Sequence, residues 1–119
     1  MGKWIGVDLD GTLAHHDGKA GSPIGRPLKP MLEKVKEWLE EGLEVRIFTA
    51  RADSTLERQK IKKWLESQGL PDLKITNKKD WEMSELWDDR AIRVEQNKGI
   101  PCSGCSGKSK YSDQILASF

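Results

Sequence analysis

The sequence predicts a Rossmann-like, doubly wound α/β fold: a mostly parallel sheet with helices on both faces, in three layers. Short apolar segments of strand character alternate along the chain with segments whose apolar residues recur at helical spacing, an alternation typical of parallel sheets. Several apolar segments also end in a chemically active polar residue, and such sheets bind ligands beyond the carboxyl ends of their strands. The 119 residues suffice for one domain of this kind.

The first half of the chain predicts two strands with a helix between them. Residues 3–7 are an apolar run that ends at Asp8, as in a buried strand. Residues 13–27 are rich in Gly, Pro and His and predict a loop. Residues 43–48, rich in β-branched and aromatic types, predict a second strand that ends at Thr49. The helix between them should end at Gly42, and its apolar stripe is Leu28, Met31, Leu32, Val35, Trp38 and Leu39.

The second half begins with Ser54-Thr55-Leu56-Glu57, a capping box that opens another helix. That helix carries Ile61, Trp64 and Leu65 on its inner face and ends before Gly69 and Pro71. Residues 73–76 predict a weaker strand, residues 80–86 a helical turn, and residues 85–87 and 91–95 further strands. We expect a catalytic domain over residues 1–97 and a tail over residues 98–119, with a short helix near residues 112–118.

The composition is that of an ordinary soluble domain. The 20 basic and 19 acidic residues give a net charge of +1, so no overall field draws the chain to nucleic acid or membrane. No apolar run approaches the ~20 residues that span a bilayer, and Met1-Gly2-Lys3-Trp4 leads directly into a strand instead of a signal peptide. We therefore expect no membrane partner, a cytoplasmic location, and reduced cysteines at Cys102 and Cys105.

The segment Asp8-Leu9-Asp10-Gly11-Thr12 carries the strongest chemical signal. Two carboxylates two residues apart leave the end of a strand, and Gly11 permits a sharp turn in which backbone N–H groups face an anion. A calcium-binding loop is the alternative interpretation of this pattern. Such a loop needs Glu at its twelfth position, where this chain has Lys19, so a calcium site is disfavoured.

This segment resembles the first signature of the haloacid dehalogenase superfamily. The later signatures follow in order: Thr49 ends the next strand, Lys79 or Lys78 precedes a later strand, and Asp88-Asp89 follows that strand. The resemblance covers about residues 3–95, and the chain is also similar to short hydrolases of this type from bacteria and phages. The resemblance implies a Mg²⁺-dependent phosphomonoesterase.

It also implies roles for the four carboxylates. Mg²⁺ would be held by Asp8, by the backbone carbonyl of Asp10, and by the pair Asp88 and Asp89, of which either could be the direct ligand. Asp8 would attack phosphorus and form an aspartyl-phosphate. Asp10 would protonate the leaving oxygen and then activate water.

The phosphate-binding residues follow from the same resemblance. Thr49 would donate a hydrogen bond to the phosphoryl oxygens, and Lys79 would neutralise their charge. Lys78 is the alternative to Lys79. Arg51 and Arg90, which follow Thr49 and the acidic pair, could grip phosphate or a second substrate group. The expected substrate-binding residues are Gly11, Thr12, Arg51 and Lys78.

The chain has little room for a cap domain, since the segments 13–27 and 69–80 are short. We therefore expect an open site. It would admit a large phosphorylated substrate, such as a nucleic-acid end or a phosphoprotein, or be covered by another subunit of an oligomer. His15, His16 and Lys19 lie on the first of these segments, where they touch substrate or only solvent.

Other interpretations remain open. The chain could be a nucleotide or polynucleotide phosphatase, a phosphotransferase, or a non-catalytic phosphate-binding protein of the same fold. A phosphoacceptor signalling domain uses the same residue types but carries its adjacent acidic pair after the first strand, which disfavours it. Cys102 and Cys105 supply only two of the four ligands of a structural zinc site. Trp81 and Trp87 flank the expected site and either pack in the core or stack on a base.

Overall fold

The structure, a computed structural model, describes residues 3–104. The chain divides into two units, Met1–Asp89 and Arg90–Phe119, and the expected domains 1–97 and 98–119 stay a prediction. The elements of the first unit are β1 (Trp4–Val7), α1 (Lys29–Glu40), β2 (Glu44–Phe48), the 3-10 helix η1 (Ala50–Asp53), α2 (Thr55–Ser67), β3 (Ile75–Thr76) and β4 (Met83–Trp87).

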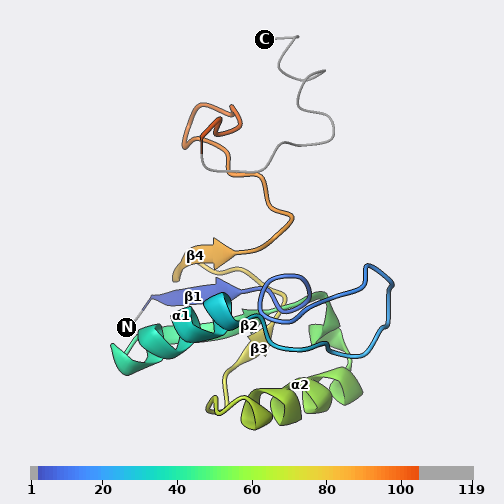
Figure 1. Cartoon of the computed structure of the whole chain (residues 1–119). Helices are drawn as coiled ribbons and strands as arrows, with labels where there is room; N and C mark the ends of the chain where they lie inside the picture. The colour runs from blue at the N-terminus through green and yellow to red at the C-terminus, as the bar shows by residue number, and fades with distance from the viewer. Residues whose placement is uncertain (1–2, 105–119) are drawn as a thin grey trace. The chain divides into compact units, whose positions relative to one another are not determined.

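The four strands form one sheet in the order β3-β2-β1-β4 (Figure 1). Every neighbouring pair is parallel, which confirms an α/β fold built on a parallel sheet. The chain steps in one direction from β1 through β2 to β3 and then returns to the other side of β1 as β4. The strand order therefore reverses between β1 and β4, and a crevice at such a reversal is where open parallel sheets bind ligands.

Both helices pack on the same face of the sheet. Ile5 and Val7 of β1 pair in register with Val45 and Ile47 of β2, so the four side chains share one face. They form one core cluster with residues of both helices, namely Val35 of α1 and Ile61 and Leu65 of α2. Two right-handed crossovers that step the same way across a sheet place their helices on one side.

The expectation of helices on both faces is therefore wrong for residues 3–89. The chain returns from β3 to β4 through residues 77–82, which contain no helix, so this connection adds no third layer. On this second face Trp4 is fully buried under the guanidinium of Arg46, which lies 4.4 Å from its ring centroid. The Trp4 indole N–H donates to Asp80 at 2.8 Å.

Two of the expected elements are corrected. The helical turn expected over residues 80–86 is instead mostly strand, since β4 spans Met83–Trp87 and pairs with β1. Pairing with a neighbouring strand decided the conformation there, against a local pattern that suited either form. The strand expected over residues 91–95 is reduced to an isolated bridge between Val94 and Pro101, because the chain turns back on itself through Asn97 and Gly99, both with positive φ.

The local signals for helix ends are confirmed. Gly42 follows α1 with φ +83°, a conformation that glycine adopts without strain. Ser54 caps α2 by accepting the backbone N–H of Glu57 at 3.2 Å. The reciprocal half of the expected capping box is absent among the described contacts, because the carboxylate of Glu57 binds Arg51 and Lys60 instead.

In the second unit the structure describes residues 90–104. The turn there is closed by the backbone N–H groups of Glu95 and Cys102, which donate to Ile100 at 2.9 Å and Arg93 at 2.7 Å. Cys102 is disulfide-bonded, which corrects the expectation that it is reduced. Cys105 and the helix expected near residues 112–118 lie outside the described residues. None of the helices in the described residues is both long and apolar enough to cross a bilayer.

Candidate active site at the carboxyl ends of β1 and β4

Three carboxylates meet where the strand order reverses. Asp8 follows β1 and Asp88 and Asp89 follow β4, and each offers an oxygen within 4.8 Å of the others. The register of the two strands produces this meeting, because Val7 pairs with Trp87 and the N–H of Asp8 donates to the carbonyl of Trp87 at 2.9 Å. The first and fourth sequence signatures, 80 positions apart as Asp8 and Asp88, therefore form one cluster.

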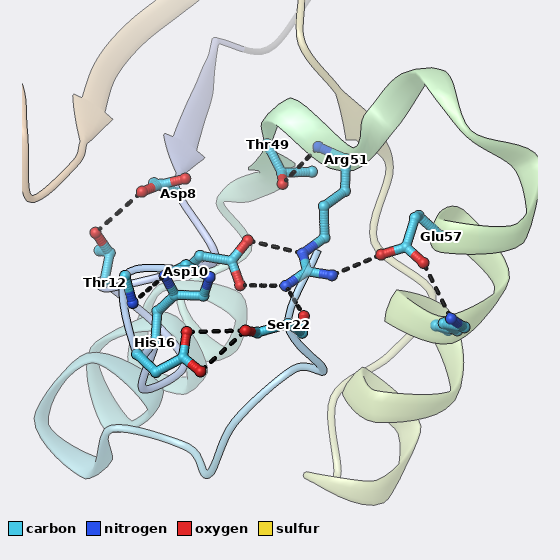
Figure 2. A network of polar contacts seen from close by, with 11 residues as sticks. Asp8, Asp10, Thr12, His16, Ser22, Thr49, Arg51 and Glu57 are labelled. Carbon is cyan, nitrogen blue, oxygen red and sulfur yellow. Dashed lines mark hydrogen bonds and ion pairs between the residues drawn. The ribbon is translucent and has the colours of Figure 1, made fainter. Parts of the chain in front are cut away.

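Thr12, on the loop after β1, contacts two members of this cluster, and Figure 2 shows its contact with Asp8. Its hydroxyl lies 3.4 Å from Oδ2 of Asp8 and 3.1 Å from Oδ1 of Asp89, and it accepts the backbone N–H of Asp89 at 3.0 Å. Gly11, with φ +87°, passes so close that a Cβ there would lie 2.6 Å from Oδ2 of Asp89. Both the positive φ and the lack of a side chain at Gly11 are therefore needed for Asp89 to occupy this place.

The electrostatics of the cluster favour a proton or a cation. Burial at the strand end, the hydrogen bond with Asp89 and the negative charges of Asp88 and Asp89 raise the pKa of Asp8 to about 7. The backbone N–H of Leu9 acts in the opposite direction and lowers this pKa. Three carboxylates this close repel one another unless positive charge lies among them.

Asp10, Arg51 and Glu57 form a second polar group, on the side of the site toward α2. Figure 2 shows the carboxylate of Asp10 turned to Arg51. Nε of Arg51 lies 2.8 Å from one carboxylate oxygen and Nη2 lies 2.9 Å from the other, a bidentate pair that fixes both position and plane. The side chains are little exposed, at 11% for Arg51 and 22% for Asp10, so solvent screens the pair only partly.

The other contacts of Arg51 come from residues that the sequence did not indicate. Its Nη1 donates to Glu57 of α2 at 2.6 Å, and its Nη2 also donates to the carbonyl of Ser22 at 2.6 Å. Four of the five N–H donors of a guanidinium are thus engaged, so Arg51 holds Asp10 in this structure and has little capacity left for phosphate. The sequence did single out Glu57, but as part of the capping box of α2 and not as a partner of Arg51.

Thr49 lies at the end of β2 and is 2% exposed. Its hydroxyl accepts the backbone N–H of Arg51 at 3.1 Å, which leaves its own proton to donate. Lys78 and Lys79 are exposed, and the ion pairs of the described residues include neither of them. The choice between the two lysines therefore stays a prediction.

The expected anion-binding backbone groups are used within the loop. The N–H of Gly11 donates to Ala14 at 2.8 Å and that of Thr12 to Leu9 at 3.3 Å. These two N–H groups are therefore not free to bind an anion in the site. Of Gly11 and Thr12, only Thr12 contacts the carboxylate cluster through its side chain, by its hydroxyl. His16 accepts the N–H of Gly18 at 3.1 Å through Nδ1.

The two tryptophans that the sequence placed beside the site differ in position and burial: Trp81 precedes β4 and so lies at the amino end of that strand, away from the carboxylates. Trp87 is 38% exposed and packs edge-on against Trp38 of α1, with ring centroids 5.0 Å apart. Trp81 is 100% exposed, which corrects the expectation that it packs in the core. The return segment 77–82 reaches the sheet again only at β4 and leaves this side chain outside.

Comparison with known proteins supports the fold alone. No family model matches the chain, and no curated protein matches it. Its structure is similar to that of a conserved protein coded by a locus from Bacteroides thetaiotaomicron, with a TM-score of 0.60 and 20% sequence identity. The match covers 100% of this chain and 93% of that one. At this identity the likeness extends to the arrangement of strands and helices and not to the chemistry.

Proposed function

We propose that the chain is a Mg²⁺-dependent phosphomonoesterase of the haloacid dehalogenase type, without a cap domain, that acts through an aspartyl-phosphate on Asp8. The observation that carries the proposal is the cluster of Asp8, Asp88 and Asp89 at the carboxyl ends of β1 and β4, where the strand order reverses. A carboxylate nucleophile and a phosphate monoester are both anions, so the reaction needs positive charge at this position.

The donor set suits Mg²⁺. Its ligand atoms are carboxylate oxygens, which a small hard cation prefers, and the exposed side of Asp89 leaves room for the waters that Mg²⁺ keeps. Asp8, Asp88 and Asp89 would hold the ion, with the carbonyl of Asp10 as a further ligand. When bound, the ion would offset the charge of the phosphoryl oxygens and of the three carboxylates.

In the first half of the reaction an oxygen of Asp8 bonds to phosphorus, and the bond from phosphorus to the leaving oxygen breaks. Asp10 gives its proton to that oxygen, so the leaving group departs as a neutral alcohol. Thr49 and Lys79, or Lys78 in its place, would bind the phosphoryl oxygens. The grip of Arg51 keeps Asp10 in one orientation on the loop after β1.

In the second half water attacks phosphorus and Asp10 takes its proton. The bond from Asp8 to phosphorus breaks, which regenerates the carboxylate and releases inorganic phosphate. Because one residue first donates and then accepts a proton, Asp10 must stay beside the reacting oxygen throughout. The ion pair with Arg51 favours the ionised form of Asp10, which is the form that exists between the two half-reactions, and it restricts the orientation of that form.

The absence of a cap is supported by the contacts of the first loop. Residues 13–27 close on themselves through the backbone bonds of His15 with Arg26 and of Leu28 with Leu13, and they are joined to α2 and η1 by the bonds from Trp64 to Gly25 and from Arg51 to Ser22. This segment is therefore a short loop tied to the rest of the first unit and not a separate domain. A site of this kind would admit large substrates.

The test is phosphate release from p-nitrophenyl phosphate with and without Mg²⁺. We expect turnover that depends on Mg²⁺, that is lost in Asp8→Asn, and that persists in the control Asp72→Asn, which changes an exposed carboxylate far from the cluster in sequence. Equal turnover by the wild type and Asp8→Asn would contradict the proposal, as would the absence of phosphate release from every phosphomonoester tested with folded protein and Mg²⁺.

A further inference from the structure

A groove of about 280 Å³ lies beside the second polar group. One wall is the loop segment of residues 21–24, and the other is the exposed side of η1 and α2. The lining residues that matter for its chemistry are Pro23, Ile24, Arg51, Glu57, Lys60 and Trp64. None of the proposed catalytic steps uses the groove.

The walls of the groove are fixed by bonds across it. Nη2 of Arg51 donates to the carbonyl of Ser22 at 2.6 Å, at one end of the loop wall. The indole N–H of Trp64 donates to the carbonyl of Gly25 at 2.9 Å, at the other end. Gly25 itself is packed against the carbonyl of His15, where a Cβ would clash. The groove thus exists before any ligand binds, which lowers the entropic cost of binding.

The groove shares one residue, Arg51, with the ion pair that contains Asp10. Arg51 lines the groove and also holds both oxygens of Asp10, and Asp10 is the residue that protonates the leaving oxygen in the proposed reaction. We propose that the groove binds the leaving group and selects an uncharged alcohol that carries a ring, such as a nucleoside. This inference rests on the proposed function and names its substrate class.

The charges of the lining favour a neutral occupant. Arg51 and Lys60 are positive, but Arg51 is paired with Asp10 and Glu57, and Lys60 lies 3.2 Å from Glu57. Two positive and two negative groups cancel, so no net charge is left to bind a second phosphate.

The side chains of the lining favour a ring. Pro23, Ile24 and Trp64 present apolar surface from both walls, and small-molecule sites are mostly apolar with a few polar groups that fix orientation. Glu57 has carboxylate lone pairs beyond those used by Arg51 and Lys60, and these can accept hydrogen bonds from hydroxyl groups of a sugar.

The test compares two phosphomonoesters with similar leaving oxygens, adenosine 5′-monophosphate and glycerol 2-phosphate. Lys60→Trp places a large side chain at the edge of the groove, on an exposed helix position. Lys63→Trp makes the same change on the same helix at an exposed position that does not line the groove. We expect Lys60→Trp to lower the ratio of kcat/KM for the nucleotide over that for glycerol 2-phosphate by about tenfold or more, and Lys63→Trp to keep the wild-type ratio.

A binding measurement separates this inference from the proposed function. Adenosine without phosphate is titrated into the wild type, and the indole N–H signal of Trp64 is followed by NMR after assignment through Trp64→Phe. A shift of that signal in the wild type and Lys63→Trp, but not in Lys60→Trp, supports the groove even if no phosphoester is turned over. Two results contradict binding of the leaving group in the groove and leave the proposed function unaffected. One is turnover by Lys60→Trp with the wild-type ratio of kcat/KM for the two substrates, and the other is no shift of the Trp64 signal in the wild type.

Discussion

Arg51 holds both carboxylate oxygens of Asp10, at 2.8 Å through Nε and 2.9 Å through Nη2. The two residues are 41 positions apart, on the loop after β1 and in η1 after β2. Their contact joins the carboxyl ends of two neighbouring strands, and the further bonds of Arg51 extend the connection to α2 and to the loop of Ser22. We infer that Arg51 is the positioning residue of the proposed general acid and base.

Arg51→Lys tests this role, because lysine keeps the charge but cannot bind two oxygens in one plane. We expect kcat to fall by about 10- to 100-fold with KM changed by less than about threefold, since the lost contact orients a group used in the transition state. Steady-state kinetics on p-nitrophenyl phosphate measure both. A rise in KM with an unaltered kcat would instead assign Arg51 to substrate binding.

Removal of the guanidinium should also destabilise the fold. Arg51→Ala leaves Asp10 and Glu57 partly buried without their partner, and we expect a loss of about 2–3 kcal/mol in the free energy of unfolding by urea. Lys60→Ala is the matched control, since it removes only the exposed partner of Glu57 and should cost less than about 0.5 kcal/mol. Equal losses in the two variants would contradict a structural role for the Arg51 contacts.

Gly11 and Gly42 offer a matched pair of substitutions. Both have positive φ, +87° and +83°, but a Cβ at Gly11 meets the carboxylate of Asp89 whereas one at Gly42 meets nothing within 4 Å. Gly42→Ala should cost about 1 kcal/mol from backbone strain alone. Gly11→Ala should cost about 2–3 kcal/mol and raise the Mg²⁺ concentration for half-maximal activity, which Gly42→Ala should leave as in the wild type.

The hydroxyl of Thr12 is predicted to arrange the carboxylates for the metal. Thr12→Val removes the contacts with Asp8 and Asp89 at nearly constant volume, and we expect the half-saturating Mg²⁺ concentration to rise by about 10-fold. Thr12→Ser keeps the hydroxyl and should restore most of the affinity. Failure of serine to restore it would show that the methyl group, and not the hydroxyl, is what matters.

The raised pKa of Asp8 predicts how stability depends on pH without Mg²⁺. The pKa is about 7 in the folded protein against the ordinary aspartate value of 3.8, so the folded state binds the proton more tightly. The resulting stabilisation is complete below the unfolded pKa and is lost as pH rises through the folded pKa. From about pH 5 to pH 8 we expect a loss of roughly 1–2 kcal/mol, reduced by solvent screening of a partly exposed carboxylate.

Urea unfolding in a chelating buffer, compared between the wild type and Asp8→Asn, isolates this contribution because asparagine does not titrate. The difference between the two proteins should change with pH in that window, and Mg²⁺ should diminish the change in the wild type. Parallel pH profiles would show that Asp8 titrates normally.

The sequence predicted those features that depend on local pattern. The apolar stripe and Gly42 located α1, the serine cap located α2, and the polar residues after strands placed Asp8 and Asp88 at one edge of the sheet. The conformation of residues 80–86 could not be predicted, because β4 forms only through pairing with β1 and its pattern also suits a helical turn. The one-sided placement of the helices likewise depends on strand order, which residues alone do not fix.

The candidate site, too, could be predicted from the sequence only in part. The sequence motifs predicted the four carboxylates of the site, which are Asp8, Asp10, Asp88 and Asp89. No motif predicted the bonds of Arg51 to Glu57 and Ser22, since only the packing of η1 and α2 against the first loop brings these residues together. The sequence offered Arg51 as a phosphate ligand because it follows Thr49, whereas its partners in the fold occupy most of its donors.

The most direct test of the central claim is a search for the covalent intermediate on Asp8. Asp10→Asn should slow hydrolysis more than formation of the aspartyl-phosphate, since water then lacks its base. After incubation with p-nitrophenyl phosphate and Mg²⁺ and an acid quench, intact-mass and peptide measurements should find one phosphoryl group on Asp8 in this variant, and none in the Asp8→Asn, Asp10→Asn double variant. A phosphoryl group on any other residue, or turnover by the wild type with no covalent adduct in Asp10→Asn, would contradict the account.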